Sequence, residues 1–346
     1  MKNKTRNIFF AFGLIAVIVM LFTFKVSFAQ LWADILHAGY WLIAILILWI
    51  ILYIMNAWTW RIIIRGSGPC PIPFWRILKL TITGFALNYA TPAGLMGGEP
   101  YKIMELKPYI GTQRATSSVL LFAMMHIFAH FWFWTTSILV YLLLALCGIL
   151  PLGIGMGIIL LLMLCFCAAG IYLFIRGYKN GMVVRLVRLL SHIPGLKRWA
   201  RRFADDHQED LQKIDHQISE LQGQNQRSFY ASFALEYIGR IMQSLEIYFM
   251  LPLFHVGDNC QLSTVNCQLS TFLLSFLILS FTSLFANLLF FLPLQLGGRE
   301  GGFAMSVAQL GMTADIGLFI SIICRVRELF FTALGLLLMK VGNSRQ

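Results

Sequence analysis

The sequence predicts an all-α fold, a polytopic transmembrane helical bundle that contains two broken, re-entrant elements. Three observations lead to this prediction. Hydrophobic residues make up 58% of the chain and charged residues only 12%, which is outside the range of soluble domains. Apolar runs long enough to cross a bilayer recur along the whole chain. Two segments rich in glycine and proline interrupt this pattern and place charged side chains beside the interruption.

We expect a single integral membrane domain over residues 1–346. Its expected parts are a first half with one broken element, a basic cytoplasmic segment, and a second half with the other broken element: 1–175 with 80–102, then 176–228, then 229–346 with 291–311. Both broken elements read Pro, then Leu, then Gly-Gly, then Glu. The halves are therefore consistent with pseudo-symmetric repeats, and paired broken segments of this kind mark the binding site of many transporters.

About seven spans are expected around the broken elements. They lie near 8–26, 40–64, 117–150, 158–175, 229–254, 272–291 and 316–339. The first resembles a signal peptide in one respect, because 27–30 could be a cleavage site, but its apolar run of about 19 residues is longer than a signal-peptide core, so we expect it to be retained. Lys2, Lys4 and Arg6 precede it, which favours an N-terminus in the cytoplasm. A simple count of spans then brings both broken elements in from the cytoplasmic face. Inverted symmetry would instead bring them in from opposite faces.

The first broken element reads Ala90-Thr-Pro-Ala-Gly-Leu-Met-Gly-Gly-Glu-Pro100, and the second reads Phe291-Leu-Pro-Leu-Gln-Leu-Gly-Gly-Arg-Glu-Gly-Gly302. Irregular backbone at membrane depth is tolerated only where it is buried in protein or lines a water-filled cavity, and charge there is costly. Both segments therefore indicate a functional site. The residues that we expect to bind substrate there are Gly97, Gly98, Glu99, Lys102, Gly297, Gly298, Arg299 and Glu300.

The chemistry of these residues suits an anionic phosphate. A broken helix offers free backbone N–H groups and a positive dipole end, and glycine lets a ligand approach the backbone. Lys102 and Arg299 add charge-assisted hydrogen bonds. The alternative is structural: each glutamate caps exposed N–H groups and pairs with a nearby base.

Other charged residues lie inside predicted spans. Arg325, Arg327 and Glu328 fall in the last span, and Glu236 and Arg240 lie four residues apart, at a spacing that allows them to pair on one helix. Ion pairs that hold helices together and a role in substrate binding both remain open for this set.

His126 and His130 also share one helical face, and their HxxxH spacing suggests a metal. No glutamate follows His126 to complete a metalloprotease signature, so a buried pair among aromatic residues is favoured. We therefore expect no metal and no cofactor.

Several function classes are disfavoured. The net charge of +12 fits basic cytoplasmic loops better than nucleic-acid binding, because the chain contains no basic soluble module. The seven cysteines include no CxxC pair with matching ligands. No Walker loop and no Gly-x-Ser-x-Gly motif occurs. ATP-driven transport by this chain alone is thus not expected, and no catalytic residue is identified.

The two broken elements resemble those of the lysylphosphatidylglycerol synthase transmembrane-region family, a flippase-like module also found in the multiple peptide resistance factor. The matching segments are Pro92-Ala-Gly-Leu-Met-Gly-Gly-Glu99 with Lys102, and Leu292-Pro-Leu-Gln-Leu-Gly-Gly-Arg-Glu300 with Gly311 and Arg325. The likeness extends over nearly the whole chain. It implies that Glu99, Lys102, Arg299, Glu300 and Arg325 line the path of a lipid headgroup.

This resemblance leads us to expect a lipid flippase that moves anionic or modified phospholipids, or isoprenoid lipids, between leaflets. One departure concerns 124–130, Met-Met-His-Ile-Phe-Ala-His, where the family often has a Glu-Arg pair and then an Asp. A different headgroup preference is therefore open. Lipid aminoacylation is not expected, because the resemblance covers only the transmembrane region.

Two other functions remain as alternatives: a membrane-embedded enzyme acting on a lipid phosphate, and an accessory subunit of an envelope biosynthetic enzyme. The expected partners are membrane lipids, with anionic headgroups at 176–228, and either a second copy of the chain or a biosynthetic partner. The expected location is a bacterial inner membrane.

Overall fold

The computed structural model describes residues 28–90, 97–180, 226–254, 267–288 and 298–340. Within these ranges the chain is helical and has no strand, which confirms the all-α prediction. The elements are α2 (Phe28–Ala38), α3 (Tyr40–Gly66), α4 (Phe74–Ala90), α5 (Gly98–Ile110), α6 (Thr112–Leu146), α7 (Ile154–Asn180), α11 (Gln226–Met250), η1 (Leu251–Phe254), α12 (Cys267–Leu288), α13 (Gly298–Gln309) and α14 (Ala314–Lys340). The expected first span and 181–225 of the basic segment lie outside the described residues.

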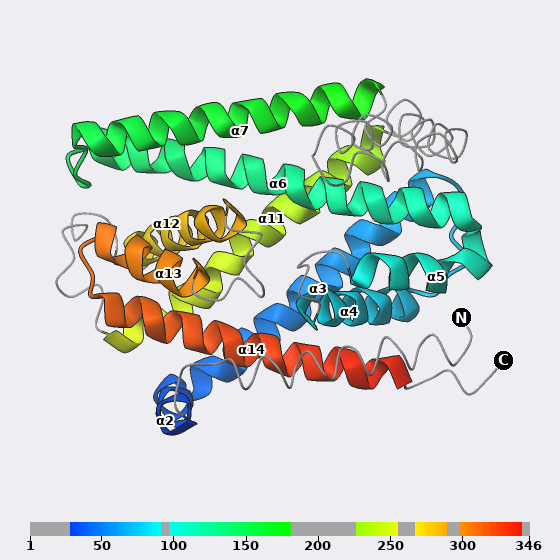
Figure 1. The fold of residues 1–346 in the computed structure, drawn as a ribbon, viewed down its shortest axis with the longest axis horizontal. Coiled ribbons are helices and arrows are strands. Elements are labelled where there is room, and N and C mark those ends of the chain that lie inside the picture. Colours follow the sequence, from blue (N-terminus) through cyan, green and yellow to red (C-terminus); the bar gives the residue numbers. More distant parts are fainter. Residues whose placement is uncertain (1–27, 91–96, 181–225, 255–266, 289–297, 341–346) are drawn as a thin grey trace, which may run out of the picture.

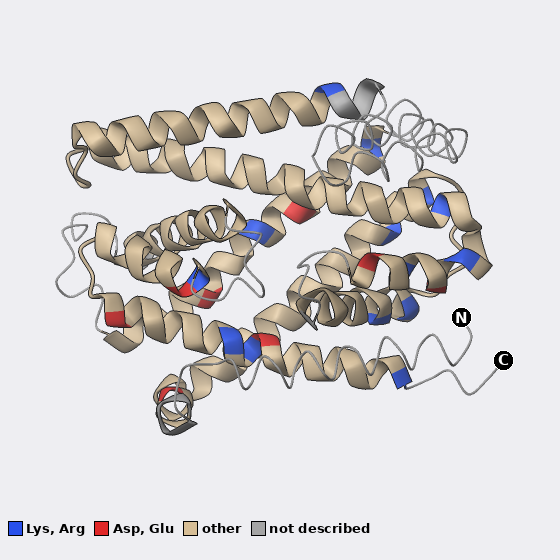
Figure 2. Ribbon diagram, viewed as in Figure 1, with Lys and Arg blue, Asp and Glu red and all other residues tan. Residues whose placement is uncertain are grey.

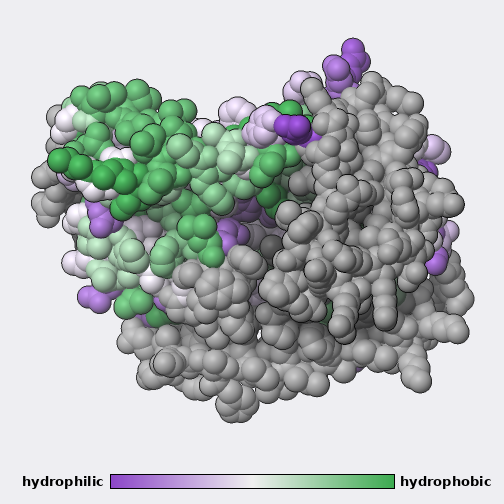
Figure 3. Space-filling view, turned by 45° about the horizontal axis from the view of Figure 1, so that its top comes forward, coloured by the Kyte–Doolittle hydropathy of each residue, from purple (hydrophilic) through white to green (hydrophobic). Residues whose placement is uncertain are grey.

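Long apolar helices make this chain a multi-pass membrane protein. Among the described residues, four helices are long and apolar enough to cross a bilayer: Tyr40–Gly66, Thr112–Leu146, Ile154–Arg176 and Leu269–Leu288. Helices α11 and α14 are of similar length but carry buried charged residues. Helix α7 exposes large apolar side chains such as Ile154 and Leu162. Such residues form an apolar patch of the outer surface, green at the upper left of Figure 3, that is suited to lipid.

Helices α3 and α11 pack against each other across the middle of the bundle (Figure 1). They run antiparallel: Trp41 stacks on Phe249 near the start of α3, and Trp49 donates a hydrogen bond to Glu246. Further along α3, Met55 lies beside Gly239. Among the described residues, they are the first long helices of the two halves, and they run in opposite directions.

The first predicted break separates α4 from α5, which fold back on each other as a hairpin. Arg76 pairs with Glu105 at its open end, and Gly98 lies on Gly84 near its closed end. Gly111 has φ 79° and lets α6 begin directly after α5. Helix α4 also packs along the second half of α14. The hairpin therefore enters and leaves at the end where α14 finishes (Figure 1).

The second break separates α12 from α13, and this hairpin enters from the opposite end (Figure 1). Helix α12 runs along the second half of α6: Trp134 donates to Ser283, and Ser137 contacts Ser280. Helix α13 starts beside the middle of α14, where Arg299 contacts Glu328. The count that placed both elements on one face is thus wrong. It treated α12 as a complete span, whereas α12 is one arm of the second hairpin.

Basic residues gather at one end of the bundle (Figure 2). This is the end where α3, α5, α7 and α14 finish and where α6 and α11 begin. The Lys and Arg residues there include Arg65, Lys107, Arg114, Arg176, Arg227 and Lys340. At the other end, where α3, α7, α12 and α14 begin, the described residues include no Lys or Arg. The two ends of the molecule therefore differ in charge.

Candidate functional site

The closed end of the first hairpin is held by Asn88. The backbone N–H of Gly98 donates to Asn88 Oδ1 at 2.7 Å, and Asn88 Nδ2 donates to Glu99 Oε1 at 3.0 Å. Glycine is required because a Cβ at residue 98 would overlap the backbone of Gly84. The side-chain amide therefore caps the start of α5 and fixes Glu99 at mid-bundle. The second carboxylate oxygen, Glu99 Oε2, is buried and has no hydrogen-bond partner among the described residues.

Lys102 lies one turn beyond Glu99, on the same face of α5. Its Nζ is 3.7 Å from Glu99 Oε1, and its side chain crosses Gly84, where any larger residue would collide with it. The ammonium also lies over the rings of Trp60 and Phe122, at 5.5 and 5.3 Å from their centroids. Lys102 is only 5% exposed, so these contacts replace the water that its charge has lost.

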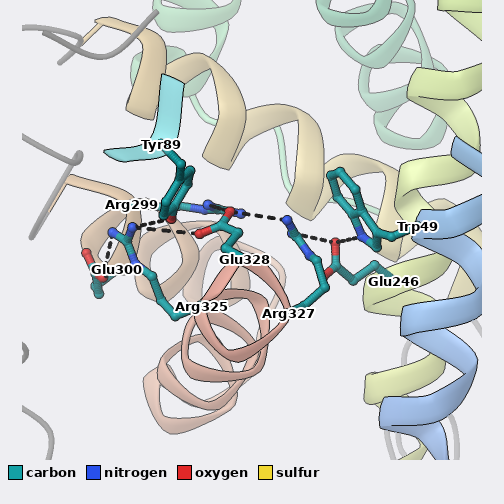
Figure 4. Close-up of polar contacts among 8 residues, drawn as sticks. All are labelled: Trp49, Tyr89, Glu246, Arg299, Glu300, Arg325, Arg327 and Glu328. Carbon is teal, nitrogen blue, oxygen red and sulfur yellow. Dashed lines mark hydrogen bonds and ion pairs between the residues drawn. The ribbon is translucent and has the colours of Figure 1, made fainter. Parts of the chain in front are cut away.

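At the closed end of the second hairpin, Arg299 and Glu300 face α14 (Figure 4). Arg299 contacts Glu328, and Glu300 Oε1 accepts from Arg325 Nε at 3.3 Å and from Nη2 at 3.1 Å. These contacts explain why two charged residues follow the Gly-Gly pair. Each has an oppositely charged partner in the middle of α14.

Arg325 joins the two hairpins. Its Nη1 donates to Tyr89 Oη at 2.6 Å, and Tyr89 is the penultimate residue of α4. The same guanidinium binds Glu300 at the start of α13, and its Nη1 is 3.8 Å from Glu328 Oε2. Arg325 is 1% exposed, whereas the Glu300 side chain is 27% exposed. The buried Arg325 thus contacts both hairpins. Of its two carboxylate partners, Glu300 is more accessible than Glu328.

A second ion pair lies next to Arg325 on α14. Arg327 donates from Nε and Nη2 to the two oxygens of Glu246, each at 3.0 Å, and its guanidinium lies 3.6 Å from the centroid of the Trp49 ring. Trp49 Nε1 in turn donates to Glu246 Oε2 at 2.9 Å. This arrangement ties α3, α11 and α14 together. We call the eight residues of Figure 4 the Arg325 network: Trp49, Tyr89, Glu246, Arg299, Glu300, Arg325, Arg327 and Glu328.

A separate group of polar side chains lies between α6 and α11. His126 Nδ1 is 2.9 Å from Glu236 Oε2, and Arg240 Nη2 contacts both ring nitrogens of His126. Arg240 Nη1 donates to Gln243 Oε1 at 3.0 Å. His130 lies next to His126, with ring centroids 5.2 Å apart. We call these five residues the Arg240 cluster.

The structure places the predicted site residues at the closed ends of the two hairpins. Gly98, Glu99 and Lys102 lie at the first closed end, with buried Gly97 preceding them, and Gly298, Arg299 and Glu300 lie at the second, beside Arg325. Gly297 lies outside the described residues.

Of the residues predicted to form intramembrane ion pairs, Arg327 and Glu328 do pair, whereas Glu236 and Arg240 do not pair directly. Arg327 pairs with Glu246 and, at 3.4 Å, with Glu328. Glu236 and Arg240 instead meet through His126, and no direct ion pair joins them among the described residues. His126 and His130 do pack among aromatic rings, including Trp134, but they are only partly buried rather than buried as predicted. The described residues contain no group of three potential metal ligands.

Sequence reasoning missed Trp49, Asn88, Tyr89 and Gln243. A signal existed for two of them: Asn88 and Tyr89 are the polar residues that end the apolar run before the first break. No comparable signal marked Trp49 or Gln243, which lie inside ordinary helical stretches.

Comparison with known proteins gives one match. No curated protein and no solved structure matches the chain. The family described as "Lysylphosphatidylglycerol synthase TM region" matches residues 8–335, which is nearly the whole length and includes both hairpins and the Arg325 network. The resemblance noted from the two broken elements is therefore confirmed. The chain belongs to the lysylphosphatidylglycerol synthase transmembrane-region family.

Proposed function

We propose that this protein translocates phosphate-bearing lipids between the leaflets of the membrane, without altering them chemically. Its family is named for the membrane region of a lipid-modifying synthase, which supports a lipid-related membrane function. The substrates that fit the charges of the site are anionic or modified phospholipids and isoprenoid lipids.

The observation that carries this proposal is the position of Arg325. It lies at mid-bundle and hydrogen-bonds one residue from each hairpin, Tyr89 and Glu300. The two hairpins enter from opposite ends of the bundle. A headgroup bound at Arg325 would therefore lie between two elements that lead to opposite membrane faces, as transport between leaflets requires.

The charge balance of the Arg325 network suggests how a phosphate binds. Three arginines, 299, 325 and 327, face three glutamates, 246, 300 and 328, so the network is neutral as it stands. A phosphate that binds Arg325 has to replace a carboxylate. Glu300 is the partner with the more accessible side chain, and its release toward solvent would make Nε and Nη2 of Arg325 available for bidentate binding while Nη1 keeps its contact with Tyr89. The acyl chains would remain in lipid against the apolar exterior.

The same proposal assigns an orientation. Lys and Arg concentrate on the cytoplasmic side of membrane proteins, so we assign the basic end of the bundle to the cytoplasm. Helix α3 ends there, and the span expected from the sequence at 8–26 would place the N-terminus in the cytoplasm as well. A bacterial inner membrane is the location that this arrangement and the family support.

Exchange of labelled phospholipids between leaflets of proteoliposomes tests the proposal. We expect exchange with the wild type, and a loss of at least about tenfold with Arg325→Gln or Glu99→Gln, since each removes a charged hydrogen-bonding group. Arg65→Gln is the matched control, because Arg65 lies exposed in the last turn of α3, outside both the Arg325 network and the basic segment 176–228. Exchange no faster than in empty liposomes, for several anionic and isoprenoid lipids, would refute translocation.

A further inference from the structure

Arg240 differs from the other cations of the candidate site. Lys102, Arg299, Arg325 and Arg327 each form an ion pair with a glutamate. The partners of Arg240 are uncharged or only weakly basic: Gln243 accepts from one guanidinium nitrogen, and His126 contacts the other. None of the ion pairs in the described part of the chain includes Arg240.

The neighbouring carboxylate, that of Glu236, does not form an ion pair with Arg240. Glu236 lies one turn before Arg240 on α11, but it places one oxygen against His126, and its other oxygen, Oε1, is buried without a hydrogen-bond partner among the described residues. The imidazole therefore stands between the glutamate and the arginine. Glu236 acts on the guanidinium only at longer range.

A buried guanidinium in this setting favours an anion. Arg240 is 8% exposed and lies within a membrane bundle, where an uncompensated charge is costly. The planar guanidinium presents five N–H donors in a fork that matches the oxygens of a phosphate. Neutral acceptors satisfy such donors without balancing the charge. A bound phosphate would supply both the hydrogen-bond acceptors and the compensating negative charge.

The position of Arg240 suits a place on the lipid path. Arg240 lies six positions before Glu246 of the Arg325 network on α11, which corresponds to about 9 Å along the helix axis. Helix α11 begins at the basic end of the bundle, so Arg240 lies on that side of the network. Lys102 Nζ lies over the Phe122 ring, whose centroid is 6.4 Å from that of His126, so Lys102 brings a second positive charge near the cluster.

The first hairpin connects the two places. Asn88 hydrogen-bonds Glu99, the partner of Lys102, while the next residue, Tyr89, hydrogen-bonds Arg325. We propose that Arg240, with Gln243 and Lys102, forms a second binding station for a lipid phosphate, distinct from the one at Arg325 and nearer the basic end. This inference rests on the proposed function, because it divides the translocation path into two successive phosphate sites.

The number of bound lipids tests this inference directly. Native mass spectrometry of the purified protein with dihexanoylphosphatidylglycerol should show two specifically bound lipids per wild-type chain. Arg240→Gln and Arg325→Gln should each retain one, with the lost site weakened by at least about tenfold. Gln243→Glu should also retain one, because the new carboxylate would lie against the Arg240 guanidinium and pair with it. It keeps the side-chain shape, so it remains informative if Arg240→Gln does not fold.

Gln113→Glu is the matched control, since Gln113 is exposed at the start of α6 and the change adds the same charge. It should retain both lipids. Inorganic phosphate added as a competitor should displace neither, and displacement of one lipid would assign the site to free phosphate instead. Two lipids on both the Arg240 and Gln243 variants would overturn the second station. Two lipids on the wild type without any leaflet exchange would refute translocation and leave the station standing.

Discussion

The ion pair between Glu246 and Arg327 should be the largest single polar contribution to the stability of the bundle. Both oxygens of Glu246 accept from Arg327, and Trp49 both donates to that carboxylate and covers the guanidinium. All three side chains come from different helices. The substitution Glu246→Gln removes the carboxylate charge while preserving its shape, and so leaves Arg327 buried without its main partner.

The expected size follows from burial. Removing one member of a buried ion pair in a soluble protein costs about 3–5 kcal/mol, since the remaining charge stays desolvated. Polar interactions within membrane proteins are usually weaker than in soluble ones. We therefore expect a loss of about 3 kcal/mol for Glu246→Gln. The Arg76–Glu105 pair at 3.4 Å is the internal comparison, because the Arg76 side chain is 32% exposed. For Glu105→Gln the expected loss is below about 1 kcal/mol.

Denaturation of the purified protein in detergent would measure both losses, and a double-mutant cycle would isolate the pair. Glu246→Gln combined with Arg327→Gln should recover much of the stability lost by Glu246→Gln alone, because neither residue then carries a buried charge. Additive losses in the cycle would show that the contact does not couple the two side chains. Equal losses for Glu246→Gln and Glu105→Gln would refute the argument from burial.

Three further results are expected. Gly98→Ala should destabilise the protein by about 1–3 kcal/mol in the same denaturation assay, since its Cβ would overlap the facing helix backbone. Gly301→Ala should not, because no atom lies within 4 Å of its added Cβ. Equal effects of the two substitutions would exclude close packing as the cause. Tyr89→Phe should slow leaflet exchange severalfold, because it removes only the hydroxyl that accepts a hydrogen bond from Arg325. Unchanged exchange would exclude that contact from the path. In single-cysteine variants, an impermeant maleimide applied to spheroplasts should label Cys147 and not Cys70, which lie at opposite ends of the bundle, and the reverse pattern would invert the orientation.

The sequence was sufficient to locate both breaks, because proline and Gly-Gly are incompatible with a continuous apolar helix at those points. It was not sufficient to find the side from which the second one enters. Helix α12 has 22 residues, or about 33 Å at the usual rise, which is the length of a bilayer span. Only its packing along the second half of α6 shows that it is an arm of a hairpin.

The spacing of residues along the chain also did not predict which charged side chains of the site pair with each other. The spacing of Glu236 and Arg240 permits an ion pair, but the packing of α6 against α11 inserts His126 between them. Glu246 and Arg327 are 81 residues apart and meet only because α11 and α14 approach each other. A four-residue spacing shows which contacts a helix allows. The tertiary arrangement decides which of them are made.

The symmetric placement of the hairpins gives the two partners of Arg325 different consequences when they are displaced. Tyr89 belongs to the hairpin that enters from the basic end, and Glu300 belongs to the hairpin that enters from the opposite end. A headgroup that replaces Tyr89 at the guanidinium would loosen the first hairpin, and one that replaces Glu300 would loosen the second. Helix α14 packs against α4 of the first hairpin and against α13 of the second, and α12 also packs on α6. A headgroup that replaces one partner of Arg325 would leave the contact with the other partner in place, so that one hairpin stays anchored while the other opens, as alternating access requires.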